Sequence, residues 1–117
     1  MATALAMITL DTTDPLRLAR WWATQLDGSI IEENDGYFVV VSLGEGVPYL
    51  AFQKVDSPTP GKNRMHLDLV SPEYPAIVDR LVANGANKIE DRQLPGTFTW
   101  TTLADIDGNE FCISGRH

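Results

Sequence analysis

The chain has 117 residues and a mass of 12.9 kDa, which suits one domain with a buried core and excludes a second domain of ordinary size. Its formal net charge of −7 argues against a nucleic-acid partner or an anionic membrane, because both require clustered lysine and arginine. The single cysteine, Cys112, excludes an internal disulfide, and the sequence shows no membrane-spanning apolar run and no secretion-signal pattern. We therefore expect a cytoplasmic protein.

The first half of the chain predicts one strand, one helix and three more strands. Residues 6–11 form the first predicted strand. The helix is expected from Pro15 to about Leu26, because Asp14 is a good N-cap and proline loses no hydrogen bond at the first helical position. Asp27-Gly28 ends this helix. The three further strands are expected near residues 29–32, 37–43 and 49–54.

A linker of residues 56–63 separates the two halves. Asp56 to Gly61 holds two prolines and a glycine, which continue neither a helix nor a central strand. The second half predicts the same order of elements, with a strand at 65–70 and a helix that begins at Pro72 or Pro75 and ends at Ala83. The later strands are expected near residues 87–90, 97–103 and 110–114.

The two halves echo each other in sequence. Leu10-Asp11 recurs as Leu67-Asp68, 57 positions later (67 minus 10). The same offset pairs Pro15 with Pro72, Ala19 with Ala76, and Gly28 with Gly85. The fold class is therefore expected to be α+β, with two βαβββ modules, residues 1–55 and 64–117, whose curved mixed sheets surround a central cleft.

Both predicted helices carry an apolar stripe that should be buried. The stripes consist of Ala19, Trp22, Ala23 and Leu26 in the first helix, and of Ile77, Val78, Leu81 and Val82 in the second. Trp21 and Trp22 are neighbours on a helix and cannot share one face. One of them is expected in the core and the other on a flank or a dimer contact.

The segment from Asp105 to Ile113 predicts a tight turn that leads into the last strand. Asp107-Gly108 supplies the turn chemistry, because glycine tolerates positive φ and aspartate bonds its own backbone. Side chains alternate along a strand, so Glu110 and Cys112 are expected to face the same side.

These segments together resemble the glyoxalase-like domain of the vicinal oxygen chelate superfamily, which covers glyoxalases, bleomycin-resistance proteins and extradiol dioxygenases. The resemblance rests on the following stretches, which span almost the whole chain as one such domain: Asp14-Pro15, Ala19-Arg20-Trp21-Trp22, Gly28, residues 62–68 and residues 107–112. It implies a small-molecule protein and, from family habit, a homodimer. Catalytic members hold a divalent metal with side chains from the first and last strands of the modules.

Transferred to this chain, the resemblance implies metal ligands at His66, Gln53 and Glu110, with Cys112 as a further candidate. The matching first-strand position of the first module falls on Met7 or Thr9, which are not usual ligands. Two alternatives stay open: a divalent ion such as Zn, Ni, Mn or Fe, or no cofactor, which the missing ligand favours.

The candidate site residues also have structural interpretations. Glu110 and His66 are the candidate catalytic pair, but His66 is also compatible with a hydrogen-bonded cleft histidine. Cys112 is also compatible with a small buried hydrophobe. The candidate ligand-binding residues are Gln53, Trp100, Tyr49 and Asp68, and Phe98 and Tyr37 are further aromatic candidates that packing explains equally well.

Three functions follow from the sequence. The first is a glyoxalase-like lyase, isomerase or transferase that acts in the cleft between the modules. The second is a metal-free protein of the bleomycin-resistance kind, which binds or sequesters a small antibiotic-type molecule and whose acidic and aromatic cleft would suit a cation. The third is a dimerising regulatory domain whose cleft is closed by Met7 and Met65.

Overall fold

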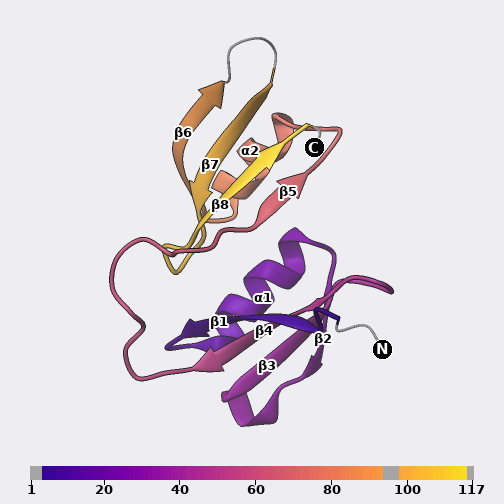
Figure 1. The fold of residues 1–117 in the computed structure, drawn as a ribbon, viewed down its shortest axis with the longest axis vertical. Helices are drawn as coiled ribbons and strands as arrows, with labels where there is room; N and C mark the ends of the chain where they lie inside the picture. Colours follow the sequence, from indigo (N-terminus) through magenta and orange to yellow (C-terminus); the bar gives the residue numbers. More distant parts are fainter. Residues whose placement is uncertain (1–3, 94–97, 116–117) are drawn as a thin grey trace. The chain divides into compact units, whose positions relative to one another are not determined.

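The computed structural model describes residues 4–93 and 98–115. In these residues the chain forms eight strands, two α-helices and a short 3-10 helix, η1 (Asn34–Gly36). Figure 1 labels the strands and α-helices along the chain. The chain divides into two compact units, residues 1–60 and 61–117. Neither described α-helix is long and apolar enough to cross a membrane.

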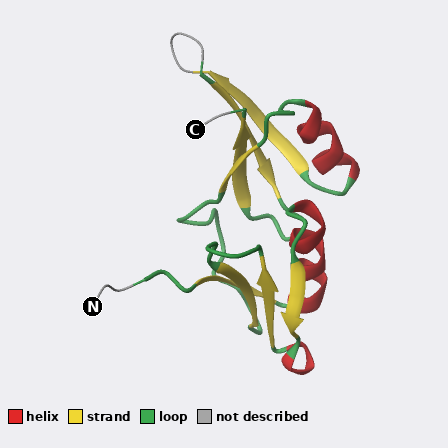
Figure 2. Ribbon diagram, turned by 90° about the vertical axis from the view of Figure 1, so that its right-hand side faces the viewer, coloured by secondary structure: helices red, strands yellow, loops and turns green. Residues whose placement is uncertain are grey.

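The first unit is a four-stranded mixed sheet with one helix on it. Its sheet has the strand order β1-β4-β3-β2, in which β1 is parallel to β4 and the other neighbours are antiparallel. Figure 2 shows the helix on one face of this sheet. The elements are β1 (Met7–Thr12), α1 (Pro15–Gln25), β2 (Ser29–Glu32), β3 (Phe38–Ser42) and β4 (Tyr49–Lys54). The predicted βαβββ order of the first half is confirmed.

Helix α1 begins and ends where its sequence predicts. The Asp14 carboxylate accepts a hydrogen bond from the Arg17 backbone N–H at 3.3 Å, and Pro15 occupies the first helical position. Both tryptophans are buried, Trp21 at 8% and Trp22 at 1% exposure, so the expectation that one lies outside the core is wrong. The two rings meet edge to face with centroids 5.0 Å apart, and each therefore covers part of the other.

The second unit repeats the architecture of the first. Its sheet has the order β5-β8-β7-β6, with β5 parallel to β8 and the other neighbours antiparallel. The elements are β5 (Asp68–Val70), α2 (Ala76–Ala83), β6 (Asn87–Gln93), β7 (Thr99–Ala104) and β8 (Glu110–Ser114). The internal repeat in the sequence therefore corresponds to two βαβββ modules. The predicted strand start at residue 97 lies outside the described residues.

Strand β5 and helix α2 of the second unit begin later than expected. Strand β5 begins at Asp68 instead of residue 65, because the Asn63 side chain takes the backbone N–H and C=O of Glu110 that would otherwise pair with the chain before β5. Helix α2 begins at Ala76, after Pro75, because proline disfavours a helical residue before it. This helix is short and buries Val78 and Leu81, whereas Val82 is 44% exposed.

The turn before β8 has the predicted chemistry. Asp105 is 1% exposed, and its carboxylate accepts hydrogen bonds from the backbone N–H groups of Asp107 and Asn109, both at 2.9 Å. Gly108 has φ of +89°, a conformation that favours glycine. The turn therefore fixes the point at which β8 starts.

Candidate functional site

The sheet of the second unit bears a cavity of about 350 Å³. Every residue that lines it belongs to residues 61–117. The lining combines charged, aromatic and small polar side chains: Lys62, His66, Asp68, Arg92, Phe98, Trp100, Thr102, Glu110, Phe111, Cys112, Ile113 and Ser114. Six of the residues that the sequence singles out thus line one cavity: His66, Asp68, Phe98, Trp100, Glu110 and Cys112.

Strand register places a row of polar residues across all four strands. Glu90 of β6 pairs with Thr102 of β7, which pairs with Cys112 of β8, which pairs with Asp68 of β5. Directly paired residues lie on the same face of a sheet. We call these four residues the polar row.

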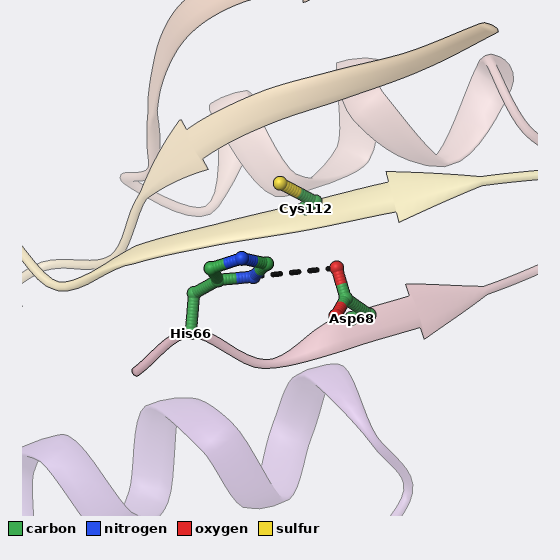
Figure 3. A group of neighbouring side chains, drawn as sticks. All are labelled: His66, Asp68 and Cys112. Atoms are coloured by element: carbon green, nitrogen blue, oxygen red, sulfur yellow. Dashed lines mark ion pairs between the residues drawn. The ribbon is translucent and has the colours of Figure 1, made fainter. Parts of the chain in front are cut away.

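His66 joins one end of the polar row. His66, Asp68 and Cys112 each offer one donor atom, and these atoms lie within 4.8 Å of one another. The His66 Nδ1 atom lies 3.3 Å from the Asp68 Oδ1 atom, and the two side chains are 49% and 44% exposed. Figure 3 shows the three side chains, which come from the segment before β5, from β5 and from β8.

The chemistry of this group fits a divalent transition metal. Imidazole, carboxylate and thiolate donors suit Zn²⁺, Ni²⁺ and Fe²⁺ better than Mn²⁺, because thiolate is a soft ligand. Ligands around a tetrahedral ion lie roughly 3.5 Å apart. The three donor atoms, which lie within 4.8 Å, would therefore approach one another by about 1.3 Å at most, and rotation of the exposed His66 and Asp68 side chains provides this. Three protein ligands and an open fourth position are typical of catalytic zinc sites.

Glu110 lies in the same cavity but outside this group. Its carboxylate is 3.7 Å from the Lys62 Nζ atom, and its side chain is 23% exposed. Its backbone is held by Asn63, whose Oδ1 atom accepts from the Glu110 N–H at 2.7 Å and whose Nδ2 atom donates to the Glu110 C=O at 3.1 Å. The backbone of Glu110 is thus anchored, and its carboxylate has a cation beside it.

The other end of the polar row holds residues that the sequence does not single out. The Arg92 Nε atom donates to the Thr102 hydroxyl at 3.1 Å, and an Arg92 Nη atom lies 3.0 Å from a Glu90 carboxylate oxygen. The Thr102 hydroxyl also lies 3.4 Å from the Cys112 sulfur. The strand predicted near residues 87–90 stops before Arg92, and the sequence names no partner for either residue across the sheet.

Gln53 and Tyr49 lie on β4 in the first unit, and both are exposed. The register of this unit matches that of the second, because Asp11 pairs with Gln53 as Asp68 pairs with Cys112. Thr9 therefore stands where His66 stands, and the internal repeat gives the correct alignment of the first strands. Thr9, Asp11 and Gln53 offer neither imidazole nor thiolate.

A model of the glyoxalase-like domain family matches residues 7–114. No curated protein sequence matches the chain significantly. Many solved structures share its fold.

Three of these structures illustrate the range of the fold. A glyoxalase/bleomycin resistance protein/dioxygenase family enzyme from Burkholderia phytofirmans PsJN is 18% identical with a TM-score of 0.80, over 98% of this chain and 100% of that chain. A mutant of the fosfomycin resistance protein FosX from Listeria monocytogenes, complexed with Mn(II) and 1S,2S-dihydroxypropylphosphonic acid, is 17% identical with a TM-score of 0.78 (100% and 93%). Lactoylglutathione lyase from Agrobacterium tumefaciens is 12% identical with a TM-score of 0.72 (97% and 94%).

The match to the family model covers nearly the whole chain, and the paired modules, their register and the structural neighbours agree with it. The chain therefore belongs to the glyoxalase-like domain family of the vicinal oxygen chelate superfamily.

Proposed function

We propose that this protein is a metal-assisted enzyme of the lyase, isomerase or transferase kind, which acts on a small molecule in the cavity of its second unit. The observation that carries the proposal is the group of His66, Asp68 and Cys112, whose three different donors lie within 4.8 Å on the wall of a cavity. The FosX relative, a protein of the same fold, was solved with Mn(II) and a small phosphonic acid.

Each polar residue of the cavity has a role in this proposal. His66, Asp68 and Cys112 would hold the ion, which as a Lewis acid polarises oxygen atoms of a bound molecule. Glu110 is the proposed proton acceptor, because it brings a carboxylate to the same cavity from a backbone position that Asn63 holds. Lys62 places a positive charge 3.7 Å from the Glu110 carboxylate.

The first prediction concerns metal binding by the chelator-treated protein. Titration with Zn²⁺, Ni²⁺, Fe²⁺ and Mn²⁺ should reveal one tight site, with Mn²⁺ the weakest. His66→Ala and Cys112→Ser should each weaken binding by about tenfold or more, because each removes one of three ligands. Co²⁺ should give a sulfur-to-metal charge-transfer band that is absent in Cys112→Ser.

The matched control for this titration is Asp11→Asn, which changes the residue that corresponds to Asp68 in the first unit. This variant should bind metal as the unchanged protein does. Gln53→Ala and Glu110→Gln test the two other predicted ligands, and a loss of affinity in either would add that residue to the set. Absence of tight divalent binding in the unchanged protein would refute the metal-assisted function.

A second candidate function is metal-free binding of a small molecule. The Phe98 and Trp100 rings line the cavity with centroids 5.6 Å apart and planes inclined by 33°. Aromatic faces of this kind bind a planar ligand without any metal. Tryptophan fluorescence of the chelator-treated protein should then respond to a planar ligand, and Trp100→Leu should abolish the response. Binding that requires added metal would contradict this alternative.

Homodimer formation and a cytoplasmic location remain predictions. Sedimentation of the purified protein over a range of concentrations tests the first, and cell fractionation tests the second.

A further inference from the structure

We propose that the cavity selects a small organic anion, whose carboxylate, phosphonate or similar oxyanion group binds Arg92 and whose planar body lies against Trp100. This inference rests on the proposal that the cavity binds a small molecule, and it names the chemical class of that molecule. It departs from the cationic ligand that the acidic and aromatic residues of the predicted cleft would suit.

The distribution of charge in the cavity supports an anion. Lys62 has the carboxylate of Glu110 at 3.7 Å, and His66 has that of Asp68 at 3.3 Å, so these two basic residues meet acidic residues within the lining itself. Arg92 has the carboxylate of Glu90 at 3.0 Å, and Glu90 is not among the described residues that line the cavity. Arg92 is thus the basic residue of the described lining whose carboxylate partner lies outside that lining.

The Arg92 guanidinium is held in place before any ligand arrives. Its Nε–H donates to Thr102 on the neighbouring strand β7, and one Nη atom is held by Glu90 on its own strand β6. A guanidinium carries five N–H donors, so three remain beyond these two contacts. An oriented guanidinium loses less conformational freedom on binding and matches the fork of an oxyanion.

The aromatic surface lies beside the cation. Arg92 pairs directly with Trp100 across β6 and β7, so the two side chains stand next to each other on one face of the sheet. Phe98 extends the aromatic surface along β7. A planar ring with an acidic substituent would therefore contact both groups at once.

The anion site also lies close to the proposed metal group. The Arg92 Nε atom lies 3.1 Å from the Thr102 hydroxyl, which lies 3.4 Å from the Cys112 sulfur, so a path of two contacts joins the guanidinium to the proposed metal group. A molecule of the size of a substituted benzene spans this separation. Arg92 would then fix the end of the ligand that does not react, and so set which oxygens face His66, Asp68 and Cys112.

Three near-isosteric probes test the charge preference: benzoate, benzamide and benzamidinium. We would titrate each into the chelator-treated chain of 117 residues and follow the backbone amide signals of the cavity residues by NMR. Benzoate should bind about tenfold more tightly than benzamide, and benzamidinium should bind most weakly. Phenylphosphonate should bind about as tightly as benzoate if the site accepts any oxyanion, and it should not bind if only a planar carboxylate fits. Both results support an anion site.

Variants assign the preference to Arg92. Arg92→Gln should lower benzoate affinity by about tenfold and leave benzamide affinity within about twofold. Arg92→Lys keeps the charge without the fork, so its benzoate affinity should be intermediate. The control Arg64→Gln removes an equal charge from an exposed residue of the same unit that does not line the cavity, and should change neither affinity.

The results separate this inference from the proposed function. The anion site is overturned if benzamide or benzamidinium binds as tightly as benzoate, or if Arg92→Gln weakens benzoate and benzamide binding equally. The metal titration decides the metal site independently of these results. If none of the probes binds, the anion site is overturned as well. An Arg92-dependent preference for benzoate in a protein that binds no metal would support the anion site and refute the metal-assisted function.

Discussion

Asn63 shows how one side chain can take the place of a strand. Its amide accepts from the backbone N–H and donates to the C=O of Glu110, as a neighbouring strand would do, and it also donates to the C=O of Met65. It thereby joins the segment before β5 to the start of β8. The backbone of a candidate catalytic residue is thus held by a residue of the predicted linker.

Replacing Asn63 by alanine should destabilise the protein by about 1–3 kcal/mol, because two backbone groups of Glu110 lose their partner. Urea denaturation of the two proteins measures this difference. Asn63→Asp keeps the acceptor and loses the donors, so its stability should lie between the two. An unchanged denaturation midpoint in Asn63→Ala would show that water replaces the amide without cost.

At the scale of single elements, a polar cluster on the other face of the sheet connects β6 to β7. The Asp91 carboxylate accepts from the Thr101 hydroxyl at 2.9 Å and lies 2.6 Å from the Lys88 Nζ atom. The hydrogen bond from Lys88 is the main cause that lowers the pKa of Asp91 below 3.8, and the hydrogen bond from Thr101 is the second. The Lys88–Asp91 hydrogen bond also raises the pKa of Lys88 above 10.5. Because both side chains are substantially exposed, solvent screens the pair.

The lowered pKa of Asp91 gives a small pH dependence of known sign. The pair stabilises the folded state above the unfolded pKa of Asp91, near 3.8, and this contribution is lost as the pH falls through the lower folded pKa. Between about pH 6 and pH 2 the unchanged protein should therefore lose more stability than Asp91→Asn. Urea denaturation at each pH measures the difference, and Asp56→Asn, in the exposed linker, should behave as the unchanged protein does.

The turn from α1 to β2 depends on a glycine for a steric reason. A Cβ atom on Gly28 would lie 2.8 Å from the Ser42 carbonyl oxygen and 2.9 Å from a Val41 methyl carbon. Gly28→Ala should therefore destabilise the protein by about 1–3 kcal/mol through overpacking. Thermal and urea denaturation test this, with the exposed Ser29→Ala as the control. A neutral Gly28→Ala would mean that β3 shifts without loss of packing.

The predicted elements succeed where local chemistry sets their ends. Strands β2, β4 and β8 have the predicted bounds, because glycine, proline and turn residues enclose their apolar or β-branched stretches. Strand β5 is shorter than predicted because the partner of Glu110 comes from Asn63, 47 positions earlier. Strand β6 extends three residues further, to Gln93, because an exposed strand of charged residues has no apolar pattern to mark it.

The sequence predicted one part of the candidate site and missed another. Polar types at strand positions identify His66, Asp68, Glu110 and Cys112 as candidates. The pairing of Cys112 with both Asp68 and Thr102, and thus the link to Arg92, depends on strand register, which the sequence alone does not give. The sequence does not single out Arg92 and Thr102, because each acquires its proposed role from a contact with a residue on another strand.

At the scale of the whole molecule, the two modules share an architecture but differ in chemistry. Corresponding positions carry Thr9, Asp11 and Gln53 in one unit and His66, Asp68 and Cys112 in the other. The full donor set thus occurs once among the described residues, and metal titration should give one ion per chain.

The net charge of −7 should make the whole molecule sensitive to salt. Repulsion among acidic groups destabilises a compact state, and salt screens it over a Debye length of about 10 Å at 0.1 M. The melting temperature should therefore rise by a few degrees between about 10 and 300 mM NaCl. The double variant Glu33→Lys and Glu45→Lys changes two exposed residues and brings the net charge from −7 to −3 (two changes of +2). The melting temperature of this variant should rise less with salt. An equal rise in both proteins would indicate a specific ion effect instead.

Each residue of the polar row comes from a different strand, so the site exists only while all four strands of the second sheet are paired. A compound that binds there binds the native state alone and stabilises it by about 2.7 kcal/mol at a concentration one hundred times its dissociation constant. Resistance to heat is therefore an assay for occupancy that requires no knowledge of the reaction. A library of small acids and metal salts, ranked by the melting temperature that each produces, would lead from this sheet to its natural ligand.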